Sequence, residues 1–143
     1  MTCSIGSTLH LHYSRFTAES AARTESSSCC ELAPLAAIAP IHAGTHCLLL
    51  APTAGGKTEA AAIPILSRML VEAWPGTSVL YVCPIKALLN NLEPRLSHYA
   101  GLVGRRVEVW HGDISQSRKN RALKDAPDIL LTTPESVEAM LIS

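Results

Sequence analysis

Residues 46–58 read HCLLLAPTAGGKT, a short apolar run that leads directly into a glycine-rich turn ending in Gly-Lys-Thr. This layout is typical of a phosphate-binding loop between a buried strand and a helix. Gly55 and Gly56 let the backbone turn tightly and present its N–H groups to phosphate oxygens, and the following helix directs its positive end to the same place. Lys57 is then expected to neutralise the β and γ phosphates of a nucleotide, and the Thr58 hydroxyl to bind Mg²⁺. The alternative is an ordinary glycine turn without a ligand.

Length and composition indicate one domain's worth of chain with a single core. The 143 residues are 48% hydrophobic, and the 12 basic residues balance the 12 acidic ones. A net charge of zero gives no indication of a polyanionic partner, so the local distribution of charge matters more. Residues 101–125 carry a surplus of three positive charges, six Lys or Arg against three Asp or Glu. A solvated helix face explains this surplus as well as a nucleic-acid surface does.

The cysteines and apolar runs are typical of an intracellular protein. The five cysteines show no paired spacing of the kind that holds zinc, and Cys47 and Cys83 fall in expected core strands. Buried free thiols suit a reducing compartment. The longest apolar run, residues 32–41, has about half the length needed to cross a bilayer. We therefore expect a cytoplasmic protein without a membrane span, with the nucleoid or nucleus as other intracellular locations.

The chain divides into a serine-rich beginning and a regular remainder. Residues 1–31 show no helical or alternating pattern, and we expect them to be poorly ordered. From residue 32 onward the patterns predict helices near 34–43, 57–73, 86–99 and 115–124 and from about 135, and strands near 46–51, 78–83, 107–110 and 129–132. Pro64 should kink the second of these helices. Alternating strands and helices predict an α/β fold, a parallel sheet with helices on both faces.

Two further loops follow strands at the edge where ligands bind on such sheets, the carboxyl ends of the strands. Pro84 ends a strand and a helix opens after it, so the N–H groups of residues 85–87 can face a backbone phosphate with Lys86 beside them. Residues 133–136 repeat the arrangement, with Thr133 as a candidate N-cap and Pro134 at the first helical position. Helix capping explains Thr133 equally well without a ligand. Neither loop can specify a base.

Together these segments resemble the motifs of superfamily 2 helicases. APTAGGKTE at 51–59, VCPIKAL at 82–88, HGD at 111–113 and TTPES at 132–136 are similar in order and spacing to motif I, motif Ia, the glycine-containing loop and motif Ib. The resemblance covers residues 34–143 and is strongest to the DEAD/DEAH-box, large-helicase-related (Lhr-like) branch. It implies that residues 32–143 are part of a P-loop NTPase (RecA-like) domain of an ATP-driven motor.

The resemblance also implies ligands and site residues. ATP and Mg²⁺ are the implied cofactors, and the backbone of DNA or RNA, contacted without regard to base sequence, is the implied partner. The nucleotide-binding residues are Thr53, Ala54, Gly55, Gly56, Lys57 and Thr58, with Thr58 also on the metal. The nucleic-acid-binding residues are Pro84, Lys86, Thr133, Pro134, Glu135 and Ser136.

The sequence departs from the family pattern in three ways. The family usually has glycine where Ala54 stands, and alanine limits access to positive φ. A glutamine upstream of motif I often reads adenine, whereas the only glutamine here is Gln116. In the family an acidic Walker B box and a second motor domain follow motif Ib, whereas this sequence stops at Ser143. The resemblance therefore predicts a truncated motor domain without a complete set of catalytic residues, with the missing motor domain as its partner.

Other functions and residues stay open at this point. The chain could be a non-enzymatic remnant that at most binds nucleic acid, or another P-loop protein such as a GTPase or small-molecule kinase. The guanine-reading Asn/Thr-Lys-x-Asp box appears nowhere in the sequence, and motifs Ia and Ib have no counterpart in GTPases or small-molecule kinases, so this alternative is the least favoured. His111 at a strand end is more typical of a packing or hydrogen-bonding residue than of a substrate contact. Trp74 and Trp110 are more typical of the core or a helix end than of a base-stacking platform.

Overall fold

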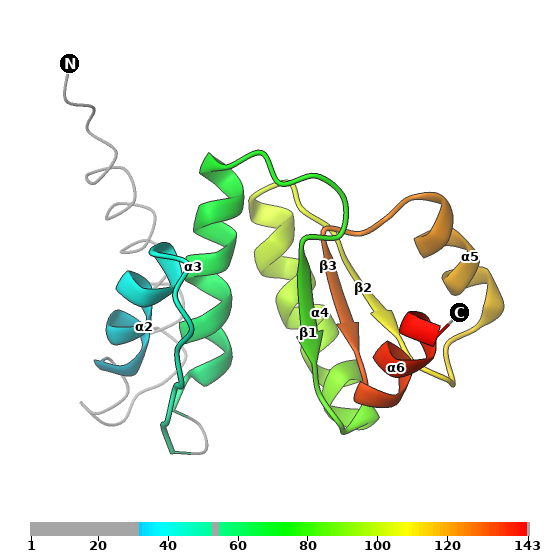
Figure 1. The fold of residues 1–143 in the computed structure, drawn as a ribbon, viewed down its shortest axis with the longest axis horizontal. Coiled ribbons are helices and arrows are strands. Elements are labelled where there is room, and N and C mark those ends of the chain that lie inside the picture. Colours follow the sequence, from blue (N-terminus) through cyan, green and yellow to red (C-terminus); the bar gives the residue numbers. More distant parts are fainter. Residues whose placement is uncertain (1–31, 53–54, 143) are drawn as a thin grey trace. The chain divides into compact units, whose positions relative to one another are not determined.

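The computed structural model describes residues 32–52 and 55–142, which divide after Arg68 into two compact units. The expected disorder of residues 1–31 lies outside the described residues. The first unit holds α2 (Leu32–His42) and most of α3 (Lys57–Val71). The second unit holds β1 (Val79–Val82), α4 (Lys86–Leu102), β2 (Val107–Trp110), α5 (Gln116–Lys124), β3 (Ile129–Thr132) and α6 (Pro134–Ile142), coloured along the chain in Figure 1.

The three strands of the second unit form one parallel sheet in the order β1-β3-β2. In the central strand, Leu131 lies opposite Tyr81 of β1 on one side and Val109 of β2 on the other. All four residues of β3 are buried, as expected for a strand covered on both faces. The strand arrows in Figure 1 point to the same end. The loops that follow the strands are therefore gathered at one edge of the sheet.

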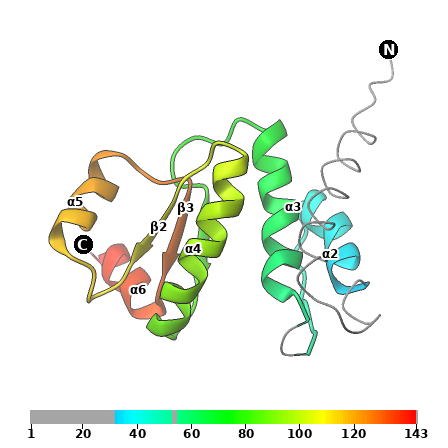
Figure 2. The ribbon, with the colours of Figure 1, turned by 180° about the vertical axis from the view of Figure 1, so that it is seen from behind.

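Helices cover both faces of this sheet, which confirms the predicted α/β architecture. α4 packs on β2 and β3 on one face, while α5 and α6 lie on the other side (Figures 1 and 2). α4 carries buried apolar residues at helical spacing, Leu89, Leu92, Leu96 and Ala100. Such a stripe is the apolar face of an amphipathic helix, and its removal from water is what holds the helix to the sheet.

α5 is held in place by charges, because none of its residues is buried. Arg118 bonds Glu93 of α4 and also Glu108 of β2, the latter at 3.1 Å. Arg121 bonds the other oxygen of Glu108 at 2.5 Å. These pairs connect α5 to β2 and to α4, the helix on the opposite face of the sheet.

The opposite end of the sheet, before β2 and β3, carries two more ion pairs. Arg105 pairs with Asp128 at 2.9 Å and donates to the Met69 carbonyl at 2.7 Å. Arg106 pairs with Asp125 at 2.5 Å. Most of the basic surplus of residues 101–125 is therefore committed to intramolecular pairs, which favours its structural explanation over an open nucleic-acid surface.

One predicted strand is wrong. Residues 45–52 adopt neither helix nor strand, although the apolar run predicts a buried strand near 46–51. The side chains of Leu48 and Leu50 are 83% and 81% exposed, and Cys47 is exposed rather than in a core, whereas Cys83 is a buried free thiol. A strand exists only through its ladder of hydrogen bonds. Among the described residues the sheet pairs only β1, β2 and β3, so this run has no ladder partner.

The helices otherwise follow the predictions. The helix predicted at 57–73 forms over Lys57–Val71 and continues through Pro64. The helix predicted at 86–99 extends to Leu102. Within residues 32–52 and 55–142, no helix is both long and apolar enough to cross a bilayer.

Candidate functional site

The glycine turn of the first unit has a backbone that favours glycine at two positions. Gly56 has a φ of +64°, in the left-handed region that other residues rarely adopt. The Gly55 N–H donates to the Pro52 carbonyl at 2.9 Å, and a β-carbon on Gly55 would lie 2.9 Å from that same oxygen. The backbone therefore approaches itself too closely for a side chain. Thr53 and Ala54, also predicted to bind nucleotide, lie outside the described residues.

Lys57 begins α3 and folds back over this turn. Its Nζ donates to the Ala51 carbonyl at 2.7 Å and to the Pro52 carbonyl at 2.6 Å. The ammonium is thus held by backbone oxygens at the positive end of the helix, where an anion is stabilised both by the helix dipole and by the lysine. The arrangement fits a phosphate, which would replace the carbonyls as the partner of the ammonium.

Thr58, the residue predicted to bind the metal, lies in the first turn of α3 and is half-buried. In the part of the chain that the structure describes, no group of three or more His, Cys, Asp or Glu side chains could hold a metal ion. A magnesium ion bound with a nucleotide here would take one protein ligand from Thr58, and phosphate oxygens and water would supply the others.

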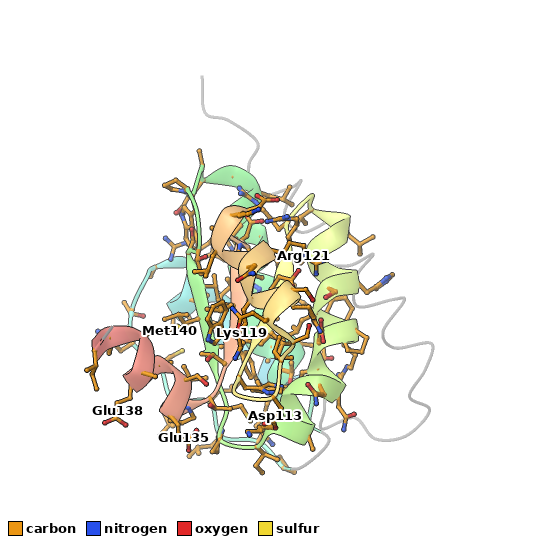
Figure 3. All side chains as sticks on the ribbon, turned by 90° about the vertical axis from the view of Figure 1, so that its right-hand side faces the viewer. Asp113, Lys119, Arg121, Glu135, Glu138 and Met140 are labelled. Carbon is orange, nitrogen blue, oxygen red and sulfur yellow. The ribbon has the colours of Figure 1, made fainter. Side chains whose placement is uncertain are left out.

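In the second unit, loops from neighbouring strands meet at the carboxyl edge of the sheet. Lys86, which follows β1, donates from Nζ to Oδ2 of Asp113, which follows β2, at 2.8 Å. Glu135 follows β3, and Figure 3 shows Asp113 and Glu135 at the same end of the unit. The structure therefore brings two predicted residues, Lys86 and Glu135, to the same edge as Asp113. Sequence reasoning did not select Asp113 for the site, although its position directly after a strand was a signal that could have found it.

The pKa values of the two carboxyls show what surrounds them. The hydrogen bond from Lys86 and the charge of the same ammonium lower the pKa of Asp113. The pKa of Glu135 is lowered first by a hydrogen bond from its own backbone N–H, then by the Thr133 hydroxyl, with a smaller effect of the Lys86 charge. The pKa of Asp113 therefore depends mainly on its bonded partner Lys86, whereas the pKa of Glu135 depends mainly on groups of its own helix start.

The two helix starts at this edge differ in their caps. Ile85, the N-cap residue of α4, offers no side-chain hydrogen bond to the first turn, and residues 84–88 are exposed. α6 begins at Pro134, as predicted, and the Thr133 hydroxyl accepts from the Ser136 N–H at 3.4 Å. Thr133 is only 2% exposed, so its hydroxyl acts as a cap. The start of α4 is the more accessible of the two to a ligand.

His111 connects the loop after β2 to α4. The ring is 3% exposed, its Nε2 lies 3.3 Å from Oδ1 of Asn90, and its Nδ1 accepts from the Asp113 N–H at 3.3 Å. These contacts fit a ring with its hydrogen on Nε2 and a lone pair on Nδ1. His111 is thus a buried hydrogen-bonding residue, the role that its position predicts. Beside it a hollow of about 310 Å³ opens between this loop, α5 and α6, with Lys119 and Ser136 in its lining.

Comparisons with known proteins match most of the chain. The family model of the DEAD/DEAH box helicases matches residues 34–143. The ATP-dependent helicase Lhr-Core of Methanothermobacter thermautotrophicus is 32% identical over 123 residues, which cover 75% of this chain and 14% of that protein. The Lhr helicase/uracil glycosylase of Escherichia coli is 35% identical over 119 residues, which cover 68% of this chain and 8% of that protein.

One solved structure agrees with these relatives. The structure of Mycobacterium smegmatis helicase Lhr bound to ssDNA and AMP-PNP matches with a TM-score of 0.65 and 34% sequence identity, over 78% of this chain and 16% of that one. The chain therefore spans between 8% and 16% of the length of these proteins.

Proposed function

The chain belongs to the DEAD/DEAH box helicase family, and we propose that it supplies the ATP-binding part of an Lhr-like, ATP-dependent nucleic-acid helicase. ATP would bind at residues 53–58, with Lys57 on the β and γ phosphates and Thr58 on Mg²⁺. A Mg²⁺ ion held by Thr58 would neutralise part of the phosphate charge. The free thiols of Cys47 and Cys83 support an intracellular, cytoplasmic location.

The turn at residues 55–57 is the observation that carries the proposal. Its backbone excludes a side chain at Gly55, adopts positive φ at Gly56, and holds the Lys57 ammonium beside the start of α3. A simple connecting turn needs neither a contact as close as that at Gly55 nor a lysine folded over it. The relative bound to AMP-PNP, a nucleotide analogue, supports the same site class.

Nucleic acid would bind at the carboxyl edge of the sheet, at the two helix starts formed by Pro84 with Lys86 and by residues 133–136. Lys86 and the uncapped first turn of α4 present an ammonium and backbone N–H groups together, which suits a phosphate of the nucleic-acid backbone. Thr133 would shape the second helix start rather than contact the ligand, since it is buried, whereas Pro134 is exposed. These groups read phosphates and not base edges, so binding would be indifferent to base sequence. The relative bound to ssDNA supports this partner class.

Equilibrium binding of a fluorescent ATP analogue tests the nucleotide site. Lys57→Ala should weaken binding by about tenfold or more. A charge-assisted contact to phosphate contributes roughly 1.5–3 kcal/mol, and part of this gain offsets the bonds to the Ala51 and Pro52 carbonyls that Lys57 gives up when the nucleotide binds. Lys124→Ala, which removes an exposed lysine at the end of α5, is the matched control and should leave the affinity unchanged. Equal affinity of all three proteins would show that the loop is only a turn.

Salt titration tests the nucleic-acid surface. With about two to four phosphates engaged, the slope of log affinity against log salt on single strands should be roughly −1.5 to −3. Lys86→Ala should flatten this slope by somewhat less than one unit, while Lys124→Ala should not. Binding that ignores salt, or that prefers one base sequence by more than about tenfold, would exclude these loops as the contact surface.

A further inference from the structure

We propose that Asp113 is a built-in competitor for the phosphate at Lys86, so that nucleic acid must exchange a protein carboxylate for a phosphate to engage this lysine. The inference rests on the proposed nucleic-acid function of the carboxyl edge. It gives Asp113 a role that the motif pattern does not give it. Asp113 would set the affinity of the contact without itself being part of the binding surface.

The ion pair is a product of the fold and not an accidental surface contact. Lys86 is the first residue of α4, and its Nζ lies 2.8 Å from Oδ2 of Asp113. The Asp113 backbone is held by His111, which is buried and faces Asn90 of the same helix α4. On the other side, Lys119 of α5 donates to the Gly112 carbonyl at 3.4 Å. The loop that carries Asp113 is therefore tied both to the helix that carries Lys86 and to α5.

Asp113 is the carboxylate that occupies Lys86, although Glu135 lies at the same edge. Asp113 bonds the ammonium directly. The pKa of Glu135 is lowered first by its own backbone N–H and then by the Thr133 hydroxyl, and Lys86 lowers it only through its charge. Removing one carboxylate, Asp113, should therefore release the lysine.

The pair can be displaced because it is exposed. The side chains of Lys86 and Asp113 are 48% and 70% exposed. Exposed pairs are weak, and their effect on an equilibrium is a factor of about two to five. A phosphate at this place could bond both the ammonium and the N–H groups of the first turn of α4, which Ile85 leaves uncapped. Nucleic acid would win the exchange, and the displaced Asp113 side chain, already mostly in solvent, would point away from the phosphate.

This exchange would make the contact weaker and more easily released than a free lysine would make it. A protein that moves along a strand needs contacts that form and break repeatedly. When the phosphate leaves, the Asp113 carboxylate returns to Lys86 and neutralises its ammonium in the protein without nucleic acid. The affinity for phosphate at Lys86 is then low because Asp113 competes for the lysine, although the site does contain a cation.

Fluorescence anisotropy with a labelled single-stranded oligothymidylate, on the full chain, tests the proposal. Asp113→Asn should tighten binding by about two- to fivefold, the strength of the exposed pair that it removes. Asp113→Glu keeps the carboxylate and should bind within about twofold of the unchanged protein. Asp125→Asn is the matched control, because Asp125 is also 70% exposed and also paired with a half-exposed cation, Arg106. It lies at the opposite end of the sheet and should leave binding unchanged.

A double-mutant cycle separates competition at Lys86 from a general effect of charge. The gain from Asp113→Asn should shrink when Lys86→Ala is present. A gain of the same size in both backgrounds, a gain matched by Asp125→Asn, or no gain at all would overturn the competition. If instead Lys86→Ala fails to weaken binding even in the Asp113→Asn background, the proposed contact at Lys86 is wrong and the inference falls with it. Thermal unfolding of each variant checks that the fold is retained.

Discussion

Removing Arg118 should destabilise the fold more than removing any exposed arginine, because Arg118 holds two partly buried carboxylates. Its guanidinium bonds Glu93 of α4 and Glu108 of β2, and the three side chains are 33%, 26% and 13% exposed respectively. The hydrogen bond to Glu93 is the main cause that raises the pKa of Arg118. Exposed pairs contribute about 0.2–1 kcal/mol, and breaking a fully buried pair costs about 3–5 kcal/mol. Arg118→Ala lies between these limits, and we expect a loss of about 1–3 kcal/mol in the free energy of unfolding.

Arg121→Ala is the matched control within the same cluster. Arg121 is 61% exposed, and Glu108 keeps its bond to Arg118 when Arg121 is removed. Its loss should therefore cost no more than about 0.5 kcal/mol. Urea unfolding followed by tryptophan fluorescence measures both values. Equal small losses for the two variants would show that α5 is not held by the Arg118 pairs. A loss at Arg118 above about 4 kcal/mol would contradict the expected size, because it would require a deeper burial than the structure has.

Three other outcomes follow from single contacts. Gly55→Ala should weaken binding of the ATP analogue by about 5- to 150-fold, because a β-carbon 2.9 Å from the Pro52 carbonyl must shift the turn, and overpacking costs about 1–3 kcal/mol. Unchanged affinity would show that the turn adapts freely. Thr133→Ala should lower the free energy of unfolding by about 1 kcal/mol through the lost cap, and Thr133→Ser should retain it; equal melting of both would contradict the capping role. NMR titration of the Asp113 carboxyl carbon should place its pKa below the ordinary value of 3.8, and Lys86→Ala should raise it toward that value. Since the pKa of Asp113 is lower in the folded state, the pair stabilises the fold above pH 3.8, and this stabilisation is lost as pH falls through the folded pKa. A pKa of Asp113 that does not change with Lys86→Ala would show that the ion pair does not form in solution.

The sequence by itself determined the elements whose signals are local. The strands predicted at 107–110 and 129–132 form over those residues, and α4 begins at Lys86 as predicted. Apolar runs, a proline after a strand and a proline at the first helical position act within a few residues, so their effect can be read without the fold. The parallel sheet followed from the alternation of strands and helices, and with it the edge where the candidate loops would gather.

Only the tertiary structure decided which distant residues meet. Residues 46–51 have no neighbouring strand to hydrogen-bond with among the described residues, although their apolar pattern is that of a buried strand. The tertiary structure also placed the arginines of residues 101–125 against carboxylates, and brought Asp113 to Lys86 across 27 positions of sequence. A local pattern specifies how a segment folds, but ladders and ion pairs need a partner from elsewhere in the chain. Which of 12 acidic residues reaches a given lysine depends on the order of the strands, and that order is set by packing.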